Sequence, residues 1–309
     1  MEKKMKIGLM IEPIDPGLSY TENLKKASEL GFKVVQLWYK DIVAQSRGDH
    51  KQFLKMLKSL GLELKSLGAY TDIIDPDIPR VTIMKNFKKV IDFASEADVR
   101  FVITESGGRP GLLEGWDEMI SRFSELAEHA GSRGVIVLVE NGPGVMVGST
   151  ELMLRMMREL NSENIGINFD PANLVLIPDD VVKAVKALGS YIMDTHAKDS
   201  ILLKKGSGRL VPDNRLAVPD NRLAVPDNRL AVLEEHIFVM PKGEDFIHLP
   251  EDVTWVLPPI GEGDVPFEEY ISALKKTGFK GDLIIEYQGG GNREKAVIQC
   301  KEYLEKILS

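Results

Sequence analysis

The chain has 309 residues, which allows either two ordinary domains or one closed α/β barrel. Its hydrophobic fraction of 43% and charged fraction of 28% are typical of a globular protein, and its formal net charge of −8 argues against a phosphate backbone as the main partner. The single cysteine, Cys300, excludes an internal disulfide and a cysteine-based zinc or iron–sulfur centre. We expect a cytoplasmic protein. No stretch approaches the roughly 18 apolar residues of a membrane span, and Ile7–Ile11 is too short for the core of a signal peptide.

Short apolar runs rich in β-branched residues alternate with segments of helical period along the chain. Most of these runs are apolar on both faces, as expected for parallel strands buried between a core and covering helices. We count eight of them: Ile7–Ile11, Val34–Trp38, Leu64–Leu67, Phe101–Thr104, Val135–Val139, Ile165–Phe169, Tyr191–Thr195 and Leu283–Ile285.

The segments between the runs begin and end as helices do. Ser19 with Glu22, and Asp49 with Gln52, form capping-box patterns ahead of apolar residues at helical spacing. Glycines stand where a left-handed residue would end a helix, at Gly31, Gly61, Gly134 and Gly278. Eight strand–helix units predict a (β/α)8 TIM barrel, with an open doubly wound sheet as the alternative.

The gap between the seventh and eighth strands is much longer than the others. The excess lies in residues 201–255, and without it the chain has about the length of a minimal barrel. We therefore expect one barrel domain over residues 1–309, with a long insertion between strand 7 and helix 7.

The insertion contains an internal repeat. The sequence Val-Pro-Asp-Asn-Arg-Leu-Ala occurs three times in succession across residues 211–231, and its proline prevents a continuous helix. One interpretation is a lid over the barrel mouth, because the loops after barrel strands surround that mouth. The other is a tandem duplication in the coding DNA, which a surface loop tolerates at little cost.

Four consecutive strands end in a side chain that can bind a metal ion. Strands five to eight end in Glu140, Asp170, His196 and Glu286. In a barrel these strand ends share one rim, the rim where barrel enzymes carry their reactive groups. Three carboxylates and one imidazole favour Mn²⁺, with Mg²⁺, Co²⁺, Fe²⁺ or Zn²⁺ as further options.

These motifs resemble the xylose isomerase-like barrel superfamily, the sugar phosphate isomerase/epimerase group. The resemblance rests on Val-Glu140-Asn-Gly-Pro, Phe-Asp170-Pro-Ala-Asn173-Leu, Thr-His196-Ala-Lys198-Asp199, Ile-Ile-Glu286-Tyr and Gly261-Glu-Gly-Asp-Val-Pro-Phe267. It covers nearly all of the chain outside residues 201–255. It implies that the four matching positions hold one divalent metal, and that Glu140 and Glu286 also act as acid and base on opposite faces of the substrate.

The chemistry accounts for these residue types. A metal on a carbonyl oxygen and its neighbouring hydroxyl stabilises the enediolate that forms when one glutamate removes the adjacent proton. Returning a proton on the other face gives an epimerase, moving it to the next carbon gives an isomerase, and losing water gives a dehydratase. We therefore predict a sugar, keto-sugar or sugar-phosphate epimerase or isomerase. The alternative is a metal-dependent lyase of the same superfamily, resembling the inosose and dehydroshikimate dehydratases.

Further residues are candidates for substrate binding. Asn173 and Lys198 follow ligand positions, and Trp38 and Glu12 lie at strand ends where a sugar face could pack, although barrel packing would also explain them. The pairings Asp-x-x-Asn and His-x-Lys-Asp look more like the L-ribulose-5-phosphate 3-epimerase branch than the ketose 3-epimerase branch. Residues Gly289–Arg293 could hold a phosphate at the start of the last helix, or form a plain strand-to-helix turn.

We expect a small-molecule carbohydrate as the partner, with no nucleic acid and no membrane, and a dimer or tetramer is plausible from the family. A nuclease resembling endonuclease IV would need many histidine ligands, whereas this chain has five histidines and carries Asn173 at one expected ligand position. A barrel that keeps its metal without catalysis is the remaining rival.

Overall fold

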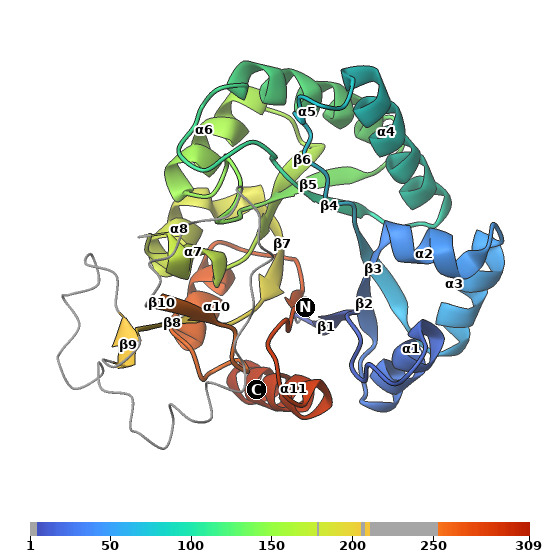
Figure 1. Cartoon of the computed structure of the whole chain (residues 1–309), viewed down its shortest axis with the longest axis vertical. Coiled ribbons are helices and arrows are strands. Elements are labelled where there is room, and N and C mark those ends of the chain that lie inside the picture. The colour runs from blue at the N-terminus through green and yellow to red at the C-terminus, as the bar shows by residue number, and fades with distance from the viewer. Residues whose placement is uncertain (1–4, 178, 205–207, 211–252) are drawn as a thin grey trace.

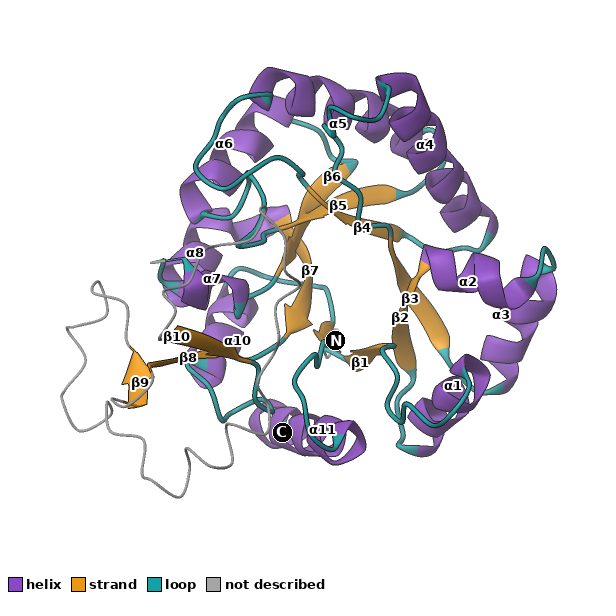
Figure 2. Ribbon diagram, viewed as in Figure 1, coloured by secondary structure: helices purple, strands orange, loops and turns teal. Residues whose placement is uncertain are grey.

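The computed structural model describes residues 5–177, 179–204, 208–210 and 253–309. Eight of its strands close into a parallel barrel in the order β1-β11-β7-β6-β5-β4-β3-β2, with helices around the outside (Figures 1 and 2). The barrel strands are β1 (Ile7–Met10), β2 (Val34–Trp38), β3 (Glu63–Gly68), β4 (Phe101–Glu105), β5 (Ile136–Glu140), β6 (Ile165–Phe169), β7 (Ile192–Ala197) and β11 (Leu283–Ile285). The predicted TIM barrel is thus confirmed, and each of the eight apolar runs overlaps one of these strands.

The helices follow the strands in chain order, and all but the short α7 at the rim belong to the outer layer. They are α1 (Tyr20–Glu29), α2 (Tyr39–Ser46), α3 (His50–Ser59), α4 (Arg80–Glu96), α5 (Trp116–Gly131), α6 (Thr150–Leu160), α7 (Asn173–Leu176), α8 (Val181–Leu188), α10 (Phe267–Lys276) and α11 (Arg293–Leu308), with a 3₁₀ turn η1 (Gly189–Tyr191). Among the described residues, no helix has the length and apolar character needed to cross a lipid bilayer.

The helix ends follow the predicted chemistry. Ser19 and Glu22 form a full capping box at the start of α1, and the Asp49 side chain accepts a hydrogen bond from the Gln52 backbone at the start of α3. The four predicted glycines all have positive φ, between 69° and 85°. A β-carbon is disfavoured in that conformation, which is why glycine marks these helix ends.

Alternate residues of each barrel strand face the helices or the inside of the barrel, and the apolar clusters show which residues face each side. Val102 and Val137 belong to the main core between the barrel and its helices. Phe101, Ile103, Ile136 and Leu138 form a separate cluster, as do Met10, Val34 and Ile284. These two smaller clusters fill the inside of the barrel. Residues two positions further along each strand therefore face the barrel mouth.

The described part of the insertion forms a small sheet of its own. Strand β8 (Ile201–Lys204) pairs antiparallel with β9 (Gly208–Leu210) and with β10 (Val253–Val256), which places the two ends of the insertion side by side. The predicted position of the insertion, after the seventh barrel strand and before the helix α10, is confirmed. The repeat at 211–231 lies outside the described residues.

Candidate active site

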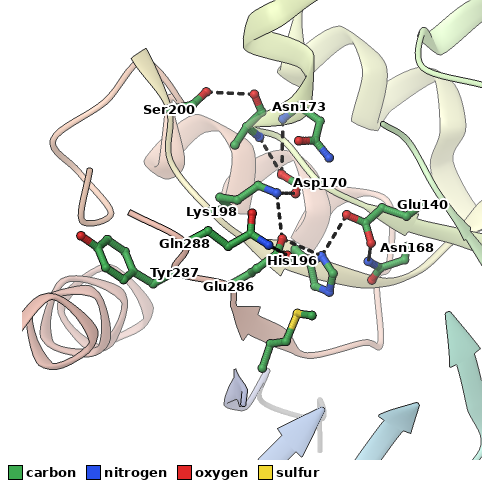
Figure 3. Close-up of polar contacts among 12 residues, drawn as sticks. Glu140, Asn168, Asp170, Asn173, His196, Lys198, Ser200, Glu286, Tyr287 and Gln288 are labelled. Atoms are coloured by element: carbon green, nitrogen blue, oxygen red, sulfur yellow. Dashed lines mark hydrogen bonds and ion pairs between the residues drawn. The ribbon is translucent and has the colours of Figure 1, made fainter. Parts of the chain in front are cut away.

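The four predicted ligands come together at the mouth of the barrel (Figure 3). Each offers one ligand atom, and these atoms all lie within 4.8 Å of one another: Glu140, Asp170, His196 and Glu286. All four side chains are buried. The strand pattern explains the convergence, because Glu140 follows the inward-facing Ile136 and Leu138 at intervals of two residues.

His196 lies between the two glutamates. Its Nδ1 is 3.1 Å from Glu140 Oε1 and 3.2 Å from Glu286 Oε2. Burial alone would lower the pKa of His196, but the two carboxylates outweigh it and raise that pKa well above its usual value. One imidazole nitrogen thus faces two carboxylates that come from different strands, β5 and the end of β11.

Lys198 adds a positive charge to the cluster. Its Nζ lies 2.6 Å from Asp170 Oδ2 and 2.8 Å from Glu286 Oε2. Burial would raise the pKa of Glu286, but Lys198 and His196 together hold it well below the usual value. Burial lowers the pKa of Lys198, whereas Asp170 and Glu286 raise it and prevail. Lys198 is therefore a charged part of the cluster.

Asp170 is held by the loops around it. Its backbone N–H donates to Asn141 Oδ1, and its Oδ1 accepts from the backbone N–H of Ala172. Asn173 donates its side-chain N–H to the carbonyl of Asn141, 2.8 Å away, and is buried. In this structure Asn173 therefore links the loops after β5 and β6, and its amide nitrogen is engaged there.

Glu140 is oriented by two donors that the sequence analysis did not single out. The Tyr70 hydroxyl donates to Glu140 Oε2 at 2.6 Å, and the Asn168 amide donates to the same oxygen at 3.1 Å. Tyr70 also packs against Trp38, with ring centroids 4.8 Å apart. The inward alternation of β6 could have indicated Asn168, two residues before Asp170. Tyr70 follows β3 in a loop, where no periodicity applies.

Trp38 and Glu12 lie together at the rim. The Trp38 indole N–H donates to Glu12 Oε1 at 3.3 Å, and burial is the main cause that raises the pKa of Glu12. The other predicted rim segment, Gly289–Arg293, precedes and begins α11. Asn292 caps that helix by accepting from the Lys295 backbone, and Arg293 donates to the Tyr287 carbonyl.

Gln36 and Gln288 contact the cluster from two further directions. The Oε1 atom of Gln36 lies 3.1 Å from His196 Nε2, and the Gln288 amide donates to Glu286 Oε1 at 3.0 Å. Both glutamines are uncharged and isolated in the sequence, and only the folded chain shows their contacts.

Asp199, next to Lys198, holds the loop that leads from the insertion back to the barrel. Its carboxylate accepts four backbone hydrogen bonds, from Ser200, Gly261, Gly263 and Val265. A β-carbon on Gly263 would collide with this carboxylate, so the close approach requires glycine. The motif from Gly261 to Phe267 thus serves to close the insertion at its base.

The donor set fits a divalent cation. Three buried carboxylates and one imidazole converge, and oxygen-rich mixed sites of this kind suit hard and borderline divalent ions. A cation there would also offset the repulsion between carboxylates, since burial raises the pKa of Asp170 and the two glutamates raise it further. The residues present can therefore hold one metal ion.

Comparisons with known proteins agree with this architecture. An uncharacterized protein of Methanocaldococcus jannaschii, MJ1311, is 23% identical over 303 residues, covering 94% of this chain and 86% of that protein. The probable 3-DHS dehydratase AsbF of Bacillus anthracis superposes with a TM-score of 0.70 at 18% identity, covering 97% of this chain and 99% of that one.

D-psicose 3-epimerase of Clostridium cellulolyticum superposes with a TM-score of 0.70 at 14% identity, covering 99% of this chain and 100% of that one. At such identities these structures show a shared fold. The family profile described as xylose isomerase-like TIM barrel matches residues 24–307. With that match over most of its length, the chain belongs to the xylose isomerase-like TIM barrel family.

Proposed function

We propose that this protein is a divalent-metal-dependent enzyme that moves a proton next to the carbonyl of a small sugar, keto-sugar or sugar phosphate, as an epimerase or isomerase. The observation that carries the proposal is the pair Glu140 and Glu286, on separate strands, on either side of His196. Two carboxylates that reach one centre from different strands suit removal of a proton from one face of a carbon and its return from the other.

The metal would be held by Glu140, Asp170, His196 and Glu286, and we prefer Mn²⁺ on the basis of the donor set. Such an ion supplies Lewis-acid polarisation of the carbonyl, which makes the neighbouring C–H acidic enough for a carboxylate. The proton transfers themselves fall to the two glutamates. Tyr70 and Asn168 fix the orientation of Glu140, and Lys198 keeps Glu286 ionised and able to accept a proton.

Substrate contacts fall to the rim. Lys198 presents an ammonium group beside Glu286, where a substrate oxygen can exchange for one of its carboxylate partners. Trp38 offers an aromatic face next to Glu12, an arrangement suited to the apolar and hydroxyl sides of a sugar ring. We assign Asn173 to the support of this rim, in contact with the loop of Asn141.

A dehydratase is the second candidate, and Lys198 favours it. A buried ammonium group in contact with Glu286 can stabilise a departing hydroxyl by hydrogen bonding, and the glutamate protonated in the first step can return its proton to that hydroxyl. The chain shares its fold with a probable 3-DHS dehydratase, which supports this alternative. It shares the same fold with a D-psicose 3-epimerase, which supports the first candidate equally.

The deciding experiment incubates the Mn²⁺-treated protein with a panel of ketoses, keto-sugars and their phosphates in D₂O. We expect an epimer or isomer of unchanged formula, apart from deuterium at the reacting carbon. A product lighter by one water would establish the lyase instead. Glu140→Gln and Glu286→Gln should each nearly abolish turnover, because an amide oxygen can ligate a metal but an amide cannot shuttle a proton.

The exposed Glu128 on α5 provides a matched control, and Glu128→Gln should retain full turnover. Near wild-type rates in both active-site variants would refute the two-glutamate mechanism. Removal of the metal with a chelator should stop turnover and lower the melting temperature, and added Mn²⁺ should restore both. A melting temperature that does not respond to Mn²⁺ would refute the metal site.

A further inference from the structure

Gln36 is a buried amide with no obvious structural reason to be polar. It lies on β2, and its inward-facing neighbour Val34 packs with Met10 and Ile284 in an apolar cluster. Its exposed fraction is 0%, so its polar atoms must find partners within the barrel. A valine or leucine would fill such a position without that demand.

The partners of Gln36 define how its amide is turned. The Oε1 atom lies 3.1 Å from His196 Nε2 and accepts a hydrogen bond from the Ser66 hydroxyl, also at 3.1 Å. The Nε2 atom of the amide faces the sulfur of Met10, 3.6 Å away. The carbonyl oxygen of Gln36 thus faces two donor groups, while its amide nitrogen faces a thioether sulfur, which is a weak acceptor.

A histidine must be neutral to bind a metal ion, and in the neutral ring this orientation decides which nitrogen of His196 carries the hydrogen. Because Gln36 presents an acceptor, Nε2 of His196 must be the donor. In neutral imidazole the other nitrogen, Nδ1, then carries the lone pair. Nδ1 is the atom that faces Glu140 and Glu286, in the centre of the carboxylate cluster. The opposite tautomer would leave an N–H, and no lone pair, on the nitrogen that faces these two carboxylates.

We infer that Gln36 is a positioning residue that selects the Nε2–H tautomer of His196 and so prepares Nδ1 to bind a divalent cation. This inference rests on the proposed metal site, and it adds a residue that does not itself touch the metal or the substrate. Ser66 assists by holding the carbonyl oxygen of Gln36 from strand β3. Loss of such an outer partner typically weakens metal affinity by about 10- to 100-fold.

The test compares Mn²⁺ affinity, measured by isothermal titration calorimetry, in the full chain and two variants. Gln36→Met has a similar length without a carbonyl, and we expect its dissociation constant to rise by about 10- to 100-fold. Gln36→Glu keeps an oxygen acceptor facing Nε2. Its dissociation constant for Mn²⁺ should be lower than that of Gln36→Met by about tenfold or more. The Co²⁺-loaded variants should differ in the same order in the intensity of their visible absorption bands.

Asn23 provides the matched control, since it is also a buried amide but lies in α1 and bonds to the carbonyls of Asp15, Leu18 and Ser19. Asn23→Ala should lower the melting temperature and leave the Mn²⁺ affinity unchanged. Equal Mn²⁺ affinity in wild type and Gln36→Met would overturn the inference and leave the metal site standing. Failure of the wild type to bind Mn²⁺ would instead overturn the proposed function, and this inference with it.

A second measurement needs no variant at position 36. The ¹⁵N chemical shifts of the imidazole nitrogens in the Zn²⁺-loaded wild type report the tautomer of each of the five histidines. The pair of signals that disappears in His196→Asn belongs to His196. We expect Nε2–H for His196. An Nδ1–H tautomer would refute the role of Gln36 directly.

Discussion

Glu105 is a carboxylate at the barrel mouth that the proposed mechanism does not use. It ends β4, and its register partner on β5 is Glu140, so both side chains face inward. No hydrogen bond or ion pair reaches its carboxyl group from any residue that the structure describes. Burial, followed by the charge of Glu140, raises the pKa of Glu105 to about 7. A group of this kind makes the folded protein less stable whenever it is ionised.

We predict that Glu105→Gln stabilises the metal-free protein at high pH. A folded-state pKa raised from 4.5 to about 7 gives a contribution to stability that is present below pH 4.5 and is lost as the pH rises through 7. Relative to wild type, the gain in Glu105→Gln should grow from under about 1 kcal/mol at pH 5 to about 3 kcal/mol at pH 8. Urea denaturation of chelator-treated protein at the two pH values measures it. A gain that does not depend on pH would contradict the burial of an ionisable group.

At the scale of elements, the loop between β10 and α10 depends on one carboxylate. Asp199 accepts two backbone N–H groups on each of its oxygens. In Asp199→Asn one oxygen becomes an NH₂ group, which leaves two backbone donors without an acceptor. We expect a loss of about 2 to 6 kcal/mol in the free energy of unfolding, since each of the two buried unpaired donors costs about 1–3 kcal/mol.

The control for this loop is Asp180, which caps α8 by accepting from the Lys183 backbone. Asp180→Asn should be nearly neutral, because asparagine caps helices as well as aspartate does. Thermal and urea unfolding of the two variants distinguish the two causes. If Asp199 holds the loop, only Asp199→Asn loses stability, whereas a general effect of losing one negative charge would be the same in both variants. If Asp199→Asn is as stable as Asp180→Asn, the carboxylate does not hold the loop.

At the scale of the whole molecule, the barrel closes without the repeat. Every strand pair of the barrel lies within residues 7–197 and 283–285, and β8 with β10 joins the two ends of the insertion. We predict that replacing residues 211–231 with a short glycine–serine linker leaves the midpoint and cooperativity of unfolding close to wild type, because changing loop length costs little. Circular dichroism during heating checks this. A broad or lost transition would show that the repeat contributes to the core.

The predictions from sequence were best for the strands and weakest for side chains whose role depends on other strands. Ile165–Phe169 and Leu283–Ile285 were predicted with the bounds that the structure has, because a buried parallel strand is apolar on both faces and ends abruptly. The four candidate ligands were predicted because parallel strands bring their carboxyl ends to one rim. Glu105 obeys the same rule but follows the apolar run Phe101–Thr104, which the sequence pattern ends one residue too early.

The sequence by itself therefore determined the barrel, the place of its insertion and the four candidate ligands at its mouth, because all of these follow from the succession of strands and their ends along a single chain. Only the tertiary structure decided how those residues act on one another. Tyr70 reaches Glu140 across 70 positions of the chain, and Gln36 reaches His196 across 160. Such contacts are set by barrel closure and by the register of strands far apart in sequence, and no local pattern encodes them.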